Sequence, residues 1–516
     1  MKGDFSRIRF DTANRYSRVL LQQGRVTLDA DANEQTDILL HYLRTLARDL
    51  IGDYGGPLAH GGFALSVSDG KLAIGAGRYY VHGILCESDG CDYAAQPDYT
   101  PAPAAAGSSG DPLLAFLKVK TPGDDRFWVY LDVWERHLSA IEVPALREVA
   151  LGGPDTCTRS KVVWQVKARA LSEIVTALQA RATALQKQIS AVTAAGGDAT
   201  ALQARLQRVQ DALAQLQQSP DTACAAPLEA LDGGEGGLGA RLEKGVQPKT
   251  PCIVAPDARY RGAENQLYRV EIHQGGSAGD ATFKWSRDNG SVASAWLGGA
   301  GNQVNVADAR GFCAGMWVEL SDDARDLAGV PGVLVRISQV EDDTLTLDAA
   351  SAAAAATIVR TAALHPKVRA WDETGDGLAN GMPLLVANAA AWLDLEDGIQ
   401  VRFDADGEYR SGDYWLIPAR VAAGPDGGID WPDGLVLPPR RAAHHYAPLG
   451  FVEWQAQANG QRTLGATPCT CTLRPLTPCQ AVRARALVDA QANIVPAPAK
   501  TVAAGKAKTP RKPKPA

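Results

Sequence analysis

A stripe of apolar side chains recurs at steps of three and four residues near the start of the chain, at Ile38, Leu39, Tyr42, Leu43, Leu46, Ala47 and Leu50. This spacing predicts an amphipathic helix of roughly five turns. Asp31 is the expected N-cap, and Glu34 lies three residues further on, as in a variant of the capping box. Gly52 and the Gly55-Gly56-Pro57 run are expected to end the helix.

Short β-prone runs on either side of a helical insertion predict several antiparallel β units. In one run the side chains expected to face the core, because they alternate with polar ones, are Tyr268, Val270 and Ile272. The Asn289-Gly290 dipeptide predicts a hairpin turn. Three further β-prone runs between residues 300 and 365 predict a small barrel-like module.

Residues 171–222 break the β pattern and predict a long helical hairpin. Its two apolar stripes are Leu171, Ile174, Leu178, Ala182, Leu185, Ile189 and Val192, then Leu202, Leu206, Val209, Leu213 and Leu216. The second stripe alternates steps of four and three, which is a heptad seam. The Gly196-Gly197-Asp198 turn joins two helices of about 30 Å each. Two uses stay open, since the seam packs within the hairpin or is offered to another protein.

The predicted fold class is therefore mainly β, of the α+β kind, with a capped N-terminal helix and an inserted αα-hairpin. A length of 516 residues favours about three domains. The predicted organisation is an N-terminal arm and helix (1–58), a β-rich N-terminal domain (59–170 plus 223–299), the inserted hairpin (171–222), the barrel-like module (300–365), a C-terminal β region (366–458) and a disordered tail (459–516).

Composition narrows the classes of partner. The formal net charge of −6 disfavours a nucleic-acid-binding body, which is expected to be basic. Residues 500–516 carry six Lys or Arg and no acid, so this tail is the segment suited to contact nucleic acid or another acidic polymer. No apolar run reaches the ~20 residues of a membrane span. The charged start MKGDFSRIRFD lacks a signal-peptide core, so we expect a cytoplasmic protein.

Nine cysteines in a long chain do not indicate a small disulfide-rich domain. Reduced thiols are the default expectation for a cytoplasmic chain. The closest cluster is Cys469, Cys471 and Cys479, whose C-x-C-x7-C spacing supplies three ligands where structural zinc takes four. We therefore predict no metal site and no cofactor.

The sequence carries no motif for phosphate, acyl or metal-dependent chemistry, so no catalytic residue is assigned. Carboxylates gather in WDETGDG (371–377) and WLDLEDG (392–398), and a pair ~5–9.5 Å apart could serve glycoside hydrolysis. Asp beside Gly more often forms turns. Trp371 and Trp392 stand near such turns, where an exposed ring could stack on a glycan or anchor a protein contact.

Several strings resemble an uncharacterised bacterial domain family whose members occur with phage-tail-like and contractile injection system proteins. They are MKGDFSR-x-RFD and YSRVLLQQGRVTLDADANEQ near the start, VYLDVWERHLSAIE (129–142), EVALGGPDT (148–156), ENQLYRVEIH (264–273), ATFKWSRDNGS (281–291), YRSGDYWLIPAR (409–420) and HHYAPLGFV (444–452). The resemblance excludes the hairpin and the basic tail. It implies a structural role, as a baseplate-like or virion component of a tail-like particle.

We therefore expect a non-enzymatic structural or adaptor protein that contacts other subunits of a phage-tail-like assembly, or further copies of itself. The expected docking element is the N-terminal arm with the start of its helix, and its candidate residues are Arg18, Arg25, Asp29, Asp31 and Glu34. The alternative is a carbohydrate- or surface-binding fibre-like module that holds a glycan through Trp371 and Trp392. A carbohydrate-active hydrolase is the less favoured third reading.

Overall fold

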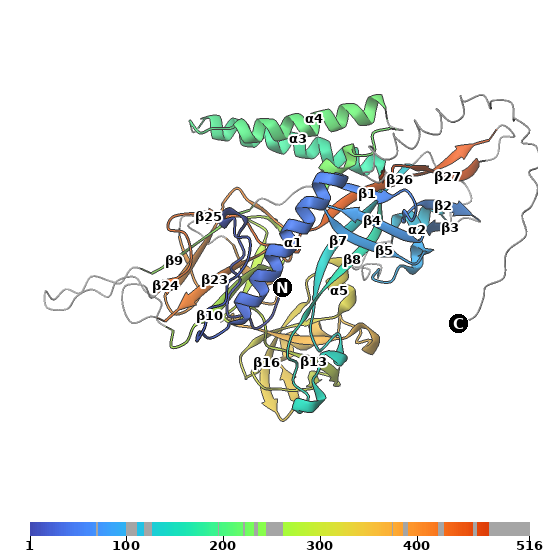
Figure 1. The fold of residues 1–516 in the computed structure, drawn as a ribbon. Helices are drawn as coiled ribbons and strands as arrows, with labels where there is room; N and C mark the ends of the chain where they lie inside the picture. Colours follow the sequence, from blue (N-terminus) through green and yellow to red (C-terminus); the bar gives the residue numbers. More distant parts are fainter. Residues whose placement is uncertain are drawn as a thin grey trace, which may run out of the picture. The chain divides into compact units, whose positions relative to one another are not determined.

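The computed structural model describes residues 1–68, 71–99, 111–117, 126–194, 196–219, 222–231, 236–243, 262–373, 375–384, 391–421, 428–457 and 462–473 (Figure 1). It is mainly β with many antiparallel sheets and few helices, which confirms the predicted α+β fold class. Residues 1–472 form one compact unit, and the basic tail lies outside the described residues. None of the described helices combines the length and the apolar character that crossing a membrane requires.

The first part of the chain holds one short helical turn, η1 (Thr12–Asn14), and then helix α1 (Asp29–Ile51). Strands β1, β4 and β5 follow as neighbours in one sheet, and β2, β3 and β6 form another. The elements of this part are β1 (Tyr54–Pro57), β2 (Leu65–Ser68), β3 (Lys71–Ile74), β4 (Gly77–Val81), β5 (Ile84–Ser88), β6 (Cys91–Asp92), η2 (Tyr93–Ala95) and α2 (Pro112–Leu117), and β28 (Thr472–Leu473) closes the described chain.

The longest strands form a four-stranded antiparallel sheet of order β27-β26-β7-β8. On one face, Val129 and Leu131 share a core with the β2–β5 region. On the other face, Trp128 and Tyr130 lie under the helical hairpin. This sheet is therefore buried on both faces. Its strands and the turns between them are β7 (Arg126–Leu138), η3 (Pro144–Leu146), η4 (Val149–Leu151), β8 (Arg159–Ala170), β26 (His445–Ala456) and β27 (Arg462–Pro468).

Strand β8 runs directly into the hairpin, which consists of α3 (Leu171–Ala194) and α4 (Thr200–Gln218) and is followed by the turn η5 (Ala226–Ala230). Figure 1 shows the two helices side by side. Ile174, Leu178 and Val209 are fully buried in a cluster that includes Trp128 of the sheet. The seam therefore packs within the hairpin and onto the sheet, which settles the choice that the sequence left open.

A disulfide joins Cys224, which follows α4, to Cys469, which follows β27. The expectation of reduced thiols throughout is wrong for this pair. The indole N–H of Trp128 also donates to the Cys224 carbonyl at 3.1 Å, so the return from the hairpin is attached to the sheet twice. The two cysteines are 245 residues apart, and no local pattern pairs them. Of the predicted three-cysteine cluster, Cys471 is a free exposed thiol and Cys479 lies outside the described residues.

Two more sheets, of order β19-β12-β10-β23-β24 and β20-β21-β9-β25, share a second core. Tyr268, Val270 and Ile272 lie in this core, as the alternation predicts. The intervening Arg269 and Glu271 are buried as well, which the alternation does not predict. The strands are β9 (Leu238–Leu242), β10 (Gln266–Ile272), β12 (Thr282–Ser286), β19 (Met382–Pro383), β20 (Leu393–Asp394), β21 (Ile399–Phe403), β23 (Tyr414–Arg420), β24 (Gly428–Ile429) and β25 (Val436–Leu437), with the separate pair β11 (Gly276–Ser277) and β22 (Glu408–Tyr409).

A closed barrel of order β13-β14-β17-β16-β15-β18 follows. Its elements are β13 (Ala293–Gly298), β14 (Gln303–Val306), β15 (Trp317–Ser321), α5 (Asp323–Ala328), β16 (Val333–Glu341), β17 (Thr344–Leu347), α6 (Ala349–Ala355), η6 (Ala362–Leu364) and β18 (Lys367–Trp371). Asn289 and Gly290 both have positive φ, as a hairpin turn requires. However, β12 pairs with β10 and β13 pairs with β14 and β18, so this turn connects a sheet to the barrel and closes no hairpin.

Strand pairing crosses the domain boundaries that the sequence predicted. β23 from 366–458 pairs with β10 from 223–299, and β26 pairs with β7 from 59–170. The predicted C-terminal region is therefore divided between two sheets that begin much earlier in the chain. β27 also pairs with β26, although it falls in the predicted tail 459–516. Backbone hydrogen bonds can join two strands at any separation along the sequence. The local pattern of apolar and polar residues does not show which strands will pair.

Candidate functional site

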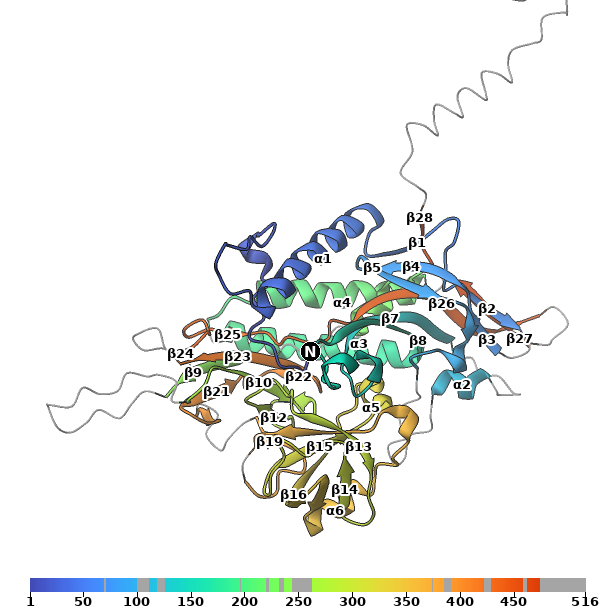
Figure 2. The ribbon, with the colours of Figure 1, turned by 60° about the horizontal axis from the view of Figure 1, so that its bottom comes forward.

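Helix α1 carries its apolar stripe on the side that faces solvent. The large apolar side chains that are 53% to 62% exposed are Leu39, Tyr42, Leu43, Leu46 and Leu50. Within the helix only Ala30 and Ile38 are buried. Figure 2 shows α1 at the outer edge of the fold. No described part of the chain covers this stripe, so the pattern predicts the helix but its apolar face is left open.

The side of α1 that faces the fold carries charged side chains together with the buried Ile38. Arg44 forms an ion pair with Glu135 of β7 at 2.9 Å, and burial together with the nearby Glu135 raises the pKa of Asp37. The helix comes so close to the β4–β5 turn that a Cβ on Gly83 would lie 2.4 Å from the carbonyl oxygen of Arg44. Gly83 has φ +78°, which glycine adopts without strain. These contacts hold the charged side inward and the apolar stripe outward.

The start of α1 differs from the predicted capping box. The helix begins at Asp29 with Leu28 at the N-cap position, so Asp31 is its third residue and not its cap. The Asp31 carboxylate accepts the backbone N–H of Leu28 at 3.1 Å, which closes the helix start from inside. Asp29 accepts the backbone N–H of Ser6 at 3.0 Å. Burial opposes its ionisation, but the hydrogen bonds from Ser6 outweigh burial and hold the pKa of Asp29 below 3.8.

The remaining predicted docking residues do not form a polar cluster. Arg18 and Arg25 are exposed and Glu34 is half-buried, and within the described residues none of the three side chains forms a hydrogen bond or ion pair. The arm is tied to the helix by the backbone N–H of Val19, which donates to Gln35 at 2.9 Å. The arm's own large apolar side chains are 67% to 84% exposed at Leu20, Leu21 and Val26. We call these three, with the α1 stripe, the N-terminal apolar surface.

Neither predicted tryptophan offers a free aromatic face. Trp371 is 0% exposed, and its indole N–H donates to Glu319 at 3.0 Å, so the expectation of an exposed ring is wrong there. Trp392 is half-buried, and the guanidinium groups of Arg241 and Arg402 lie 4.1 and 4.9 Å from its ring centroid. The sequence places both rings beside turns, but it does not show which side chains cover them.

The structure brings together carboxylates from the two acidic strings. Asp372 and Glu396 both pair with Arg287, at 3.3 and 2.8 Å, and Tyr268 donates to Glu396 at 2.9 Å. Burial raises the pKa of Glu396. Because a guanidinium is bound to both carboxylates, the arrangement is an ion-pair network and not an open acid–base pair.

A buried ionic network joins the chain start to the second core and the barrel. Lys284 lies 3.4 Å from Glu271 and 2.7 Å from Glu319, and Lys2 lies 2.8 Å from Glu271. Each carboxylate has a cation beside it, and these cations outweigh burial and lower the pKa of Glu319 to about 2. Glu373 nearby has no hydrogen-bond partner, and burial raises its pKa to about 8, so it is a neutral acid at neutral pH.

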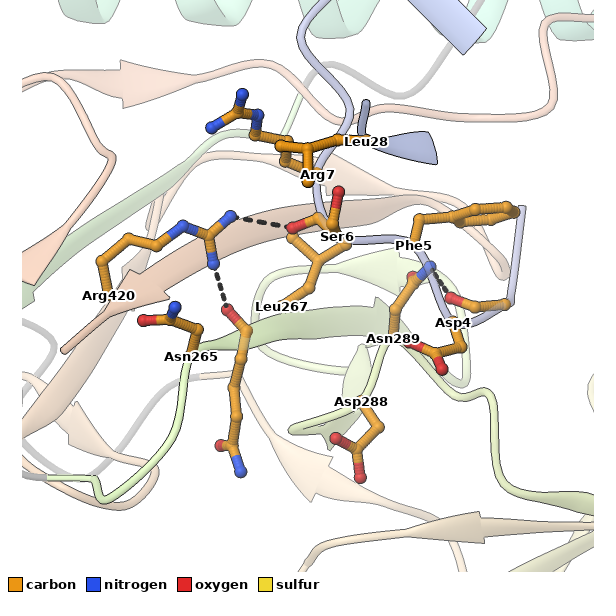
Figure 3. A pocket seen from close by; sticks show the side chains of 12 residues that line it. Asp4, Phe5, Ser6, Arg7, Leu28, Asn265, Leu267, Asp288, Asn289 and Arg420 are labelled. Carbon is orange, nitrogen blue, oxygen red and sulfur yellow. Dashed lines mark hydrogen bonds between the residues drawn. The ribbon is translucent and has the colours of Figure 1, made fainter. Parts of the chain in front are cut away.

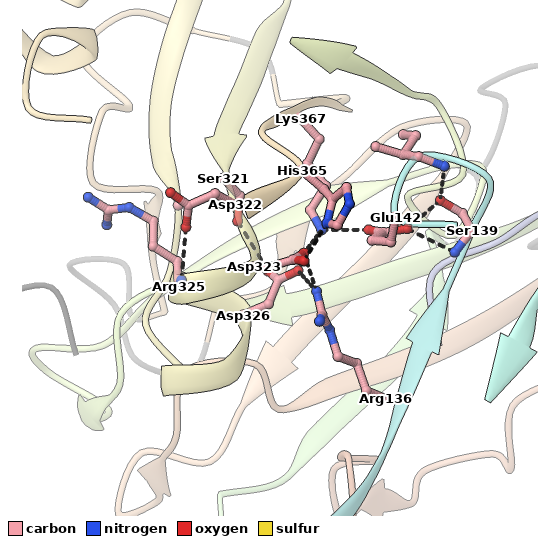
Figure 4. Close-up of polar contacts among 12 residues, drawn as sticks. Arg136, Ser139, Glu142, Ser321, Asp322, Asp323, Arg325, Asp326, His365 and Lys367 are labelled. Carbon is pink, nitrogen blue, oxygen red and sulfur yellow. Dashed lines mark hydrogen bonds and ion pairs between the residues drawn. The ribbon is translucent and has the colours of Figure 1, made fainter. Parts of the chain in front are cut away.

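Three carboxylates between β7 and the barrel have the composition of a metal site. Ligand oxygens of Glu142, Asp323 and Asp326 lie within 4.8 Å of one another. The Lys367 ammonium is 2.6 Å from Glu142 and 2.6 Å from Asp326, and Arg136 is 2.5 Å from Asp323 (Figure 4). These side chains supply the positive charge that a metal would, so the cluster acts as an ionic attachment between the sheet and the barrel.

The nearest approach to a catalytic dyad is His444 and Asp132. Their side chains are 2.7 Å apart, and Lys167 also pairs with Asp132 at 2.7 Å. These partners outweigh burial and lower the pKa of Asp132. In the part of the chain that the structure describes, no hydroxyl or thiol hydrogen-bonds to His444, so no nucleophile is aligned with this dyad.

Comparisons with known proteins give a family and no activity. Residues 1–515 match the family described as "Family of unknown function (DUF6519)". No curated protein matches. Among solved structures, one described as "Crystal structure of TssK" aligns with 76% of this chain and 99% of its own, at 10% identity and a TM-score of 0.16. That TM-score does not establish a shared fold.

Proposed function

Since the chain belongs to the DUF6519 family of unknown function, we propose that it is a non-enzymatic structural subunit that docks through the N-terminal apolar surface. The observation that supports the proposal is the orientation of α1, which exposes Leu39, Tyr42, Leu43, Leu46 and Leu50 to solvent while Ile38 and Arg44 face the fold. The phage-tail-like setting rests on the sequence resemblance given above.

The exposed apolar stripe of α1 is expected to pack against another protein surface. Contiguous apolar surface on a soluble protein marks sites of protein contact, and fully burying one Leu-sized side chain is worth about 1.5–3 kcal/mol. The α1 side chains at 39, 42, 43, 46 and 50 recur at steps of three and four, the spacing with which one helix receives the side chains of another.

The occupant that we propose is a second copy of this chain. Closed dimers are the commonest form of homo-oligomer, and a two-fold axis brings identical patches together. The α1 stripe is apolar along its length, so it is complementary to itself. The expected interface therefore pairs α1 with α1, with the arm side chains Leu20, Leu21 and Val26 at its margin.

The test is the mass of the full chain in solution, by size exclusion with light scattering across a wide range of concentration. The test variant combines Leu39→Gln, Leu43→Gln and Leu46→Gln, because Gln matches Leu in helix propensity. The control combines Thr45→Gln and Asp49→Gln at exposed polar positions of the same helix. We expect oligomers for the natural chain and the control, and monomers for the test variant. A natural chain that is monomeric at every concentration would overturn the choice of partner.

The two alternatives have less structural support. The fibre-like glycan-binding reading depended on Trp371 and Trp392, of which the first is buried and the second is covered by two arginines. The hydrolase reading depended on a free carboxylate pair, and Asp372 and Glu396 are instead bound to Arg287. We therefore keep the structural role as the conclusion.

A further inference from the structure

Three arginines meet at a hollow beside the N-terminal arm. Arg7 and Arg9 come from the arm and Arg420 ends β23, and together with the start of β24 and Asp430 they line a space of about 370 Å³. A second hollow of about 320 Å³ adjoins it and shares Arg7 and Arg420. Figure 3 shows the guanidinium groups of Arg7 and Arg420 on the same side of the arm. All three lie within strings that carry the family resemblance, but no pattern in the sequence assigns them a role.

Positive charge predominates among the described residues that line the larger hollow. Arg420 donates to the backbone carbonyls of Gln266, Ala419 and Ser6, at 3.2, 3.0 and 2.8 Å, and none of these acceptors carries a charge. Within the described residues, Arg7 and Arg9 form no hydrogen bond and no ion pair. Among the described residues, the lining of this hollow holds three guanidinium groups and one carboxylate, Asp430, whereas Asp4 and Asp288 line the adjoining hollow.

One of these donors is also removed from water. Nε of Arg7 is buried and has no hydrogen-bond partner. A buried donor without an acceptor is unfavourable, more so when it belongs to a cation. Burial and the nearby charge of Arg7 lower the pKa of Arg420, which shows that the two cations repel each other. An anion in the hollow would offset this repulsion.

We propose that Arg7, Arg9 and Arg420 form a binding site for the carboxylates of an acidic peptide segment on a partner subunit. Guanidinium groups bind carboxylates through two parallel hydrogen bonds, and two of these three have no internal acceptor to give up. The formal net charge of −6 disfavours a long polyanion such as nucleic acid, whereas a short acidic segment needs only local attraction.

This inference rests on the proposed function, because the anion is assigned to a docking subunit. The anion site would be a second contact with the docking subunit, in addition to the N-terminal apolar surface. Leu28, the residue before α1, lines the adjoining hollow, so the anion site lies beside the start of the helix that carries the exposed apolar side chains.

The test measures binding of a fluorescein-labelled hexaglutamate peptide to the full chain by anisotropy. The variant combines Arg7→Gln and Arg9→Gln, which breaks no internal hydrogen bond, and thermal unfolding confirms that it is folded. The control is Arg15→Gln, an exposed arginine of the same arm outside both hollows. We expect about tenfold weaker binding for the double variant and no change for the control. Inorganic phosphate is expected to compete with the peptide, because two of its oxygens can accept the two parallel N–H bonds of a guanidinium group, as a carboxylate does.

Equal peptide binding by the double variant and the natural chain would overturn the inference. Tighter binding of a single-stranded oligonucleotide than of the peptide, lost in the same variant, would also overturn it and assign the site to nucleic acid. The α1 glutamine variant separates this inference from the proposed function. If it is monomeric and binds the peptide normally, both hold. If the natural chain is itself monomeric but loses peptide binding with Arg7 and Arg9, the anion site stands alone.

Discussion

Two helical regions of this protein have similar apolar stripes and use them in opposite ways. The hairpin α3–α4 packs Ile174, Leu178 and Val209 onto the β7–β26 sheet. Helix α1 turns Leu43 and Leu46 to solvent and places Arg44 against β7. Periodicity therefore identifies an amphipathic helix, but it does not show whether the surface that packs on its apolar face belongs to the same chain. The orientation of α1 depends on the face opposite the stripe, because a charged side chain on that face, Arg44, forms an ion pair with the sheet.

The largest difference between the two regions is expected from the same substitution made in each. Leu178→Ala removes a side chain that is 0% exposed in the hairpin, and we expect a loss of about 2–5 kcal/mol in the free energy of unfolding. Leu46→Ala is its control on α1, where the side chain is open, and we expect a change within about 0.5 kcal/mol. Denaturant unfolding at low protein concentration measures both. Equal losses would mean that α1 buries its stripe in solution.

The disulfide is expected to stabilise the hairpin region and not α1. Cys224→Ser opens the link to Cys469, and we expect a loss of about 2–4 kcal/mol in the free energy of unfolding. Cys471→Ser is the control, since Cys471 is a free exposed thiol. Hydrogen exchange locates the effect. If the Cys224 substitution increased hydrogen exchange more in α1 than in α4, the disulfide would not act mainly on the hairpin region.

The charged side of α1 is expected to contribute a smaller amount. Arg44 and Glu135 are each about one-third exposed, so solvent screens their ion pair, and Arg44→Ala is expected to cost about 0.2–1 kcal/mol. Arg48→Ala is the control, because Arg48 and Asp53 are more exposed and their pair is expected to contribute almost nothing. Chemical denaturation of both variants measures the difference. A larger loss for Arg48 would show that α1 is oriented differently.

The smallest effect is a dependence on pH at the start of α1. The pKa of Asp29 is lowered in the folded chain, so its contribution is present above the ordinary value of 3.8 and is lost as the pH falls through the folded value. The amide of Ser6, which donates to Asp29, is expected to shift in an NMR titration as the pH falls below that ordinary value. Asp29→Asn should remove the titration, and an unchanged titration would assign it to another group.

Local features were predictable from the sequence. The helix at 38–50, the hairpin at 171–222 and the inward Tyr268, Val270 and Ile272 each follow from spacing within one segment. The sequence predicts the helix start three residues too late, because Asp31 resembles an N-cap, although its carboxylate accepts a hydrogen bond from Leu28 at the actual N-cap position. A short polar side chain can satisfy that end of a helix from either position.

Features that depend on distant segments were not predictable. Lys284 and Glu319 look like solvent-facing residues of amphipathic strands, and they are buried because the chain start and the barrel pack on that face. Trp371 is buried for the same reason. In the proposed anion site, Arg420 lies over four hundred residues from Arg7 and Arg9 along the chain, and its hydrogen bond to Ser6 joins the two segments. No pattern within one segment reports such a meeting.

The pairing of β7 with β26 has a consequence for synthesis. Asp132 and its partner His444 are 312 residues apart. At the usual rate of about 5–20 residues per second, a ribosome needs roughly 15–60 s to travel that distance. During this interval β7 has β8 on one side and an unpaired edge on the other. The hairpin is synthesised directly after β8, so it can cover Trp128 before β26, the third strand of the sheet, has been made.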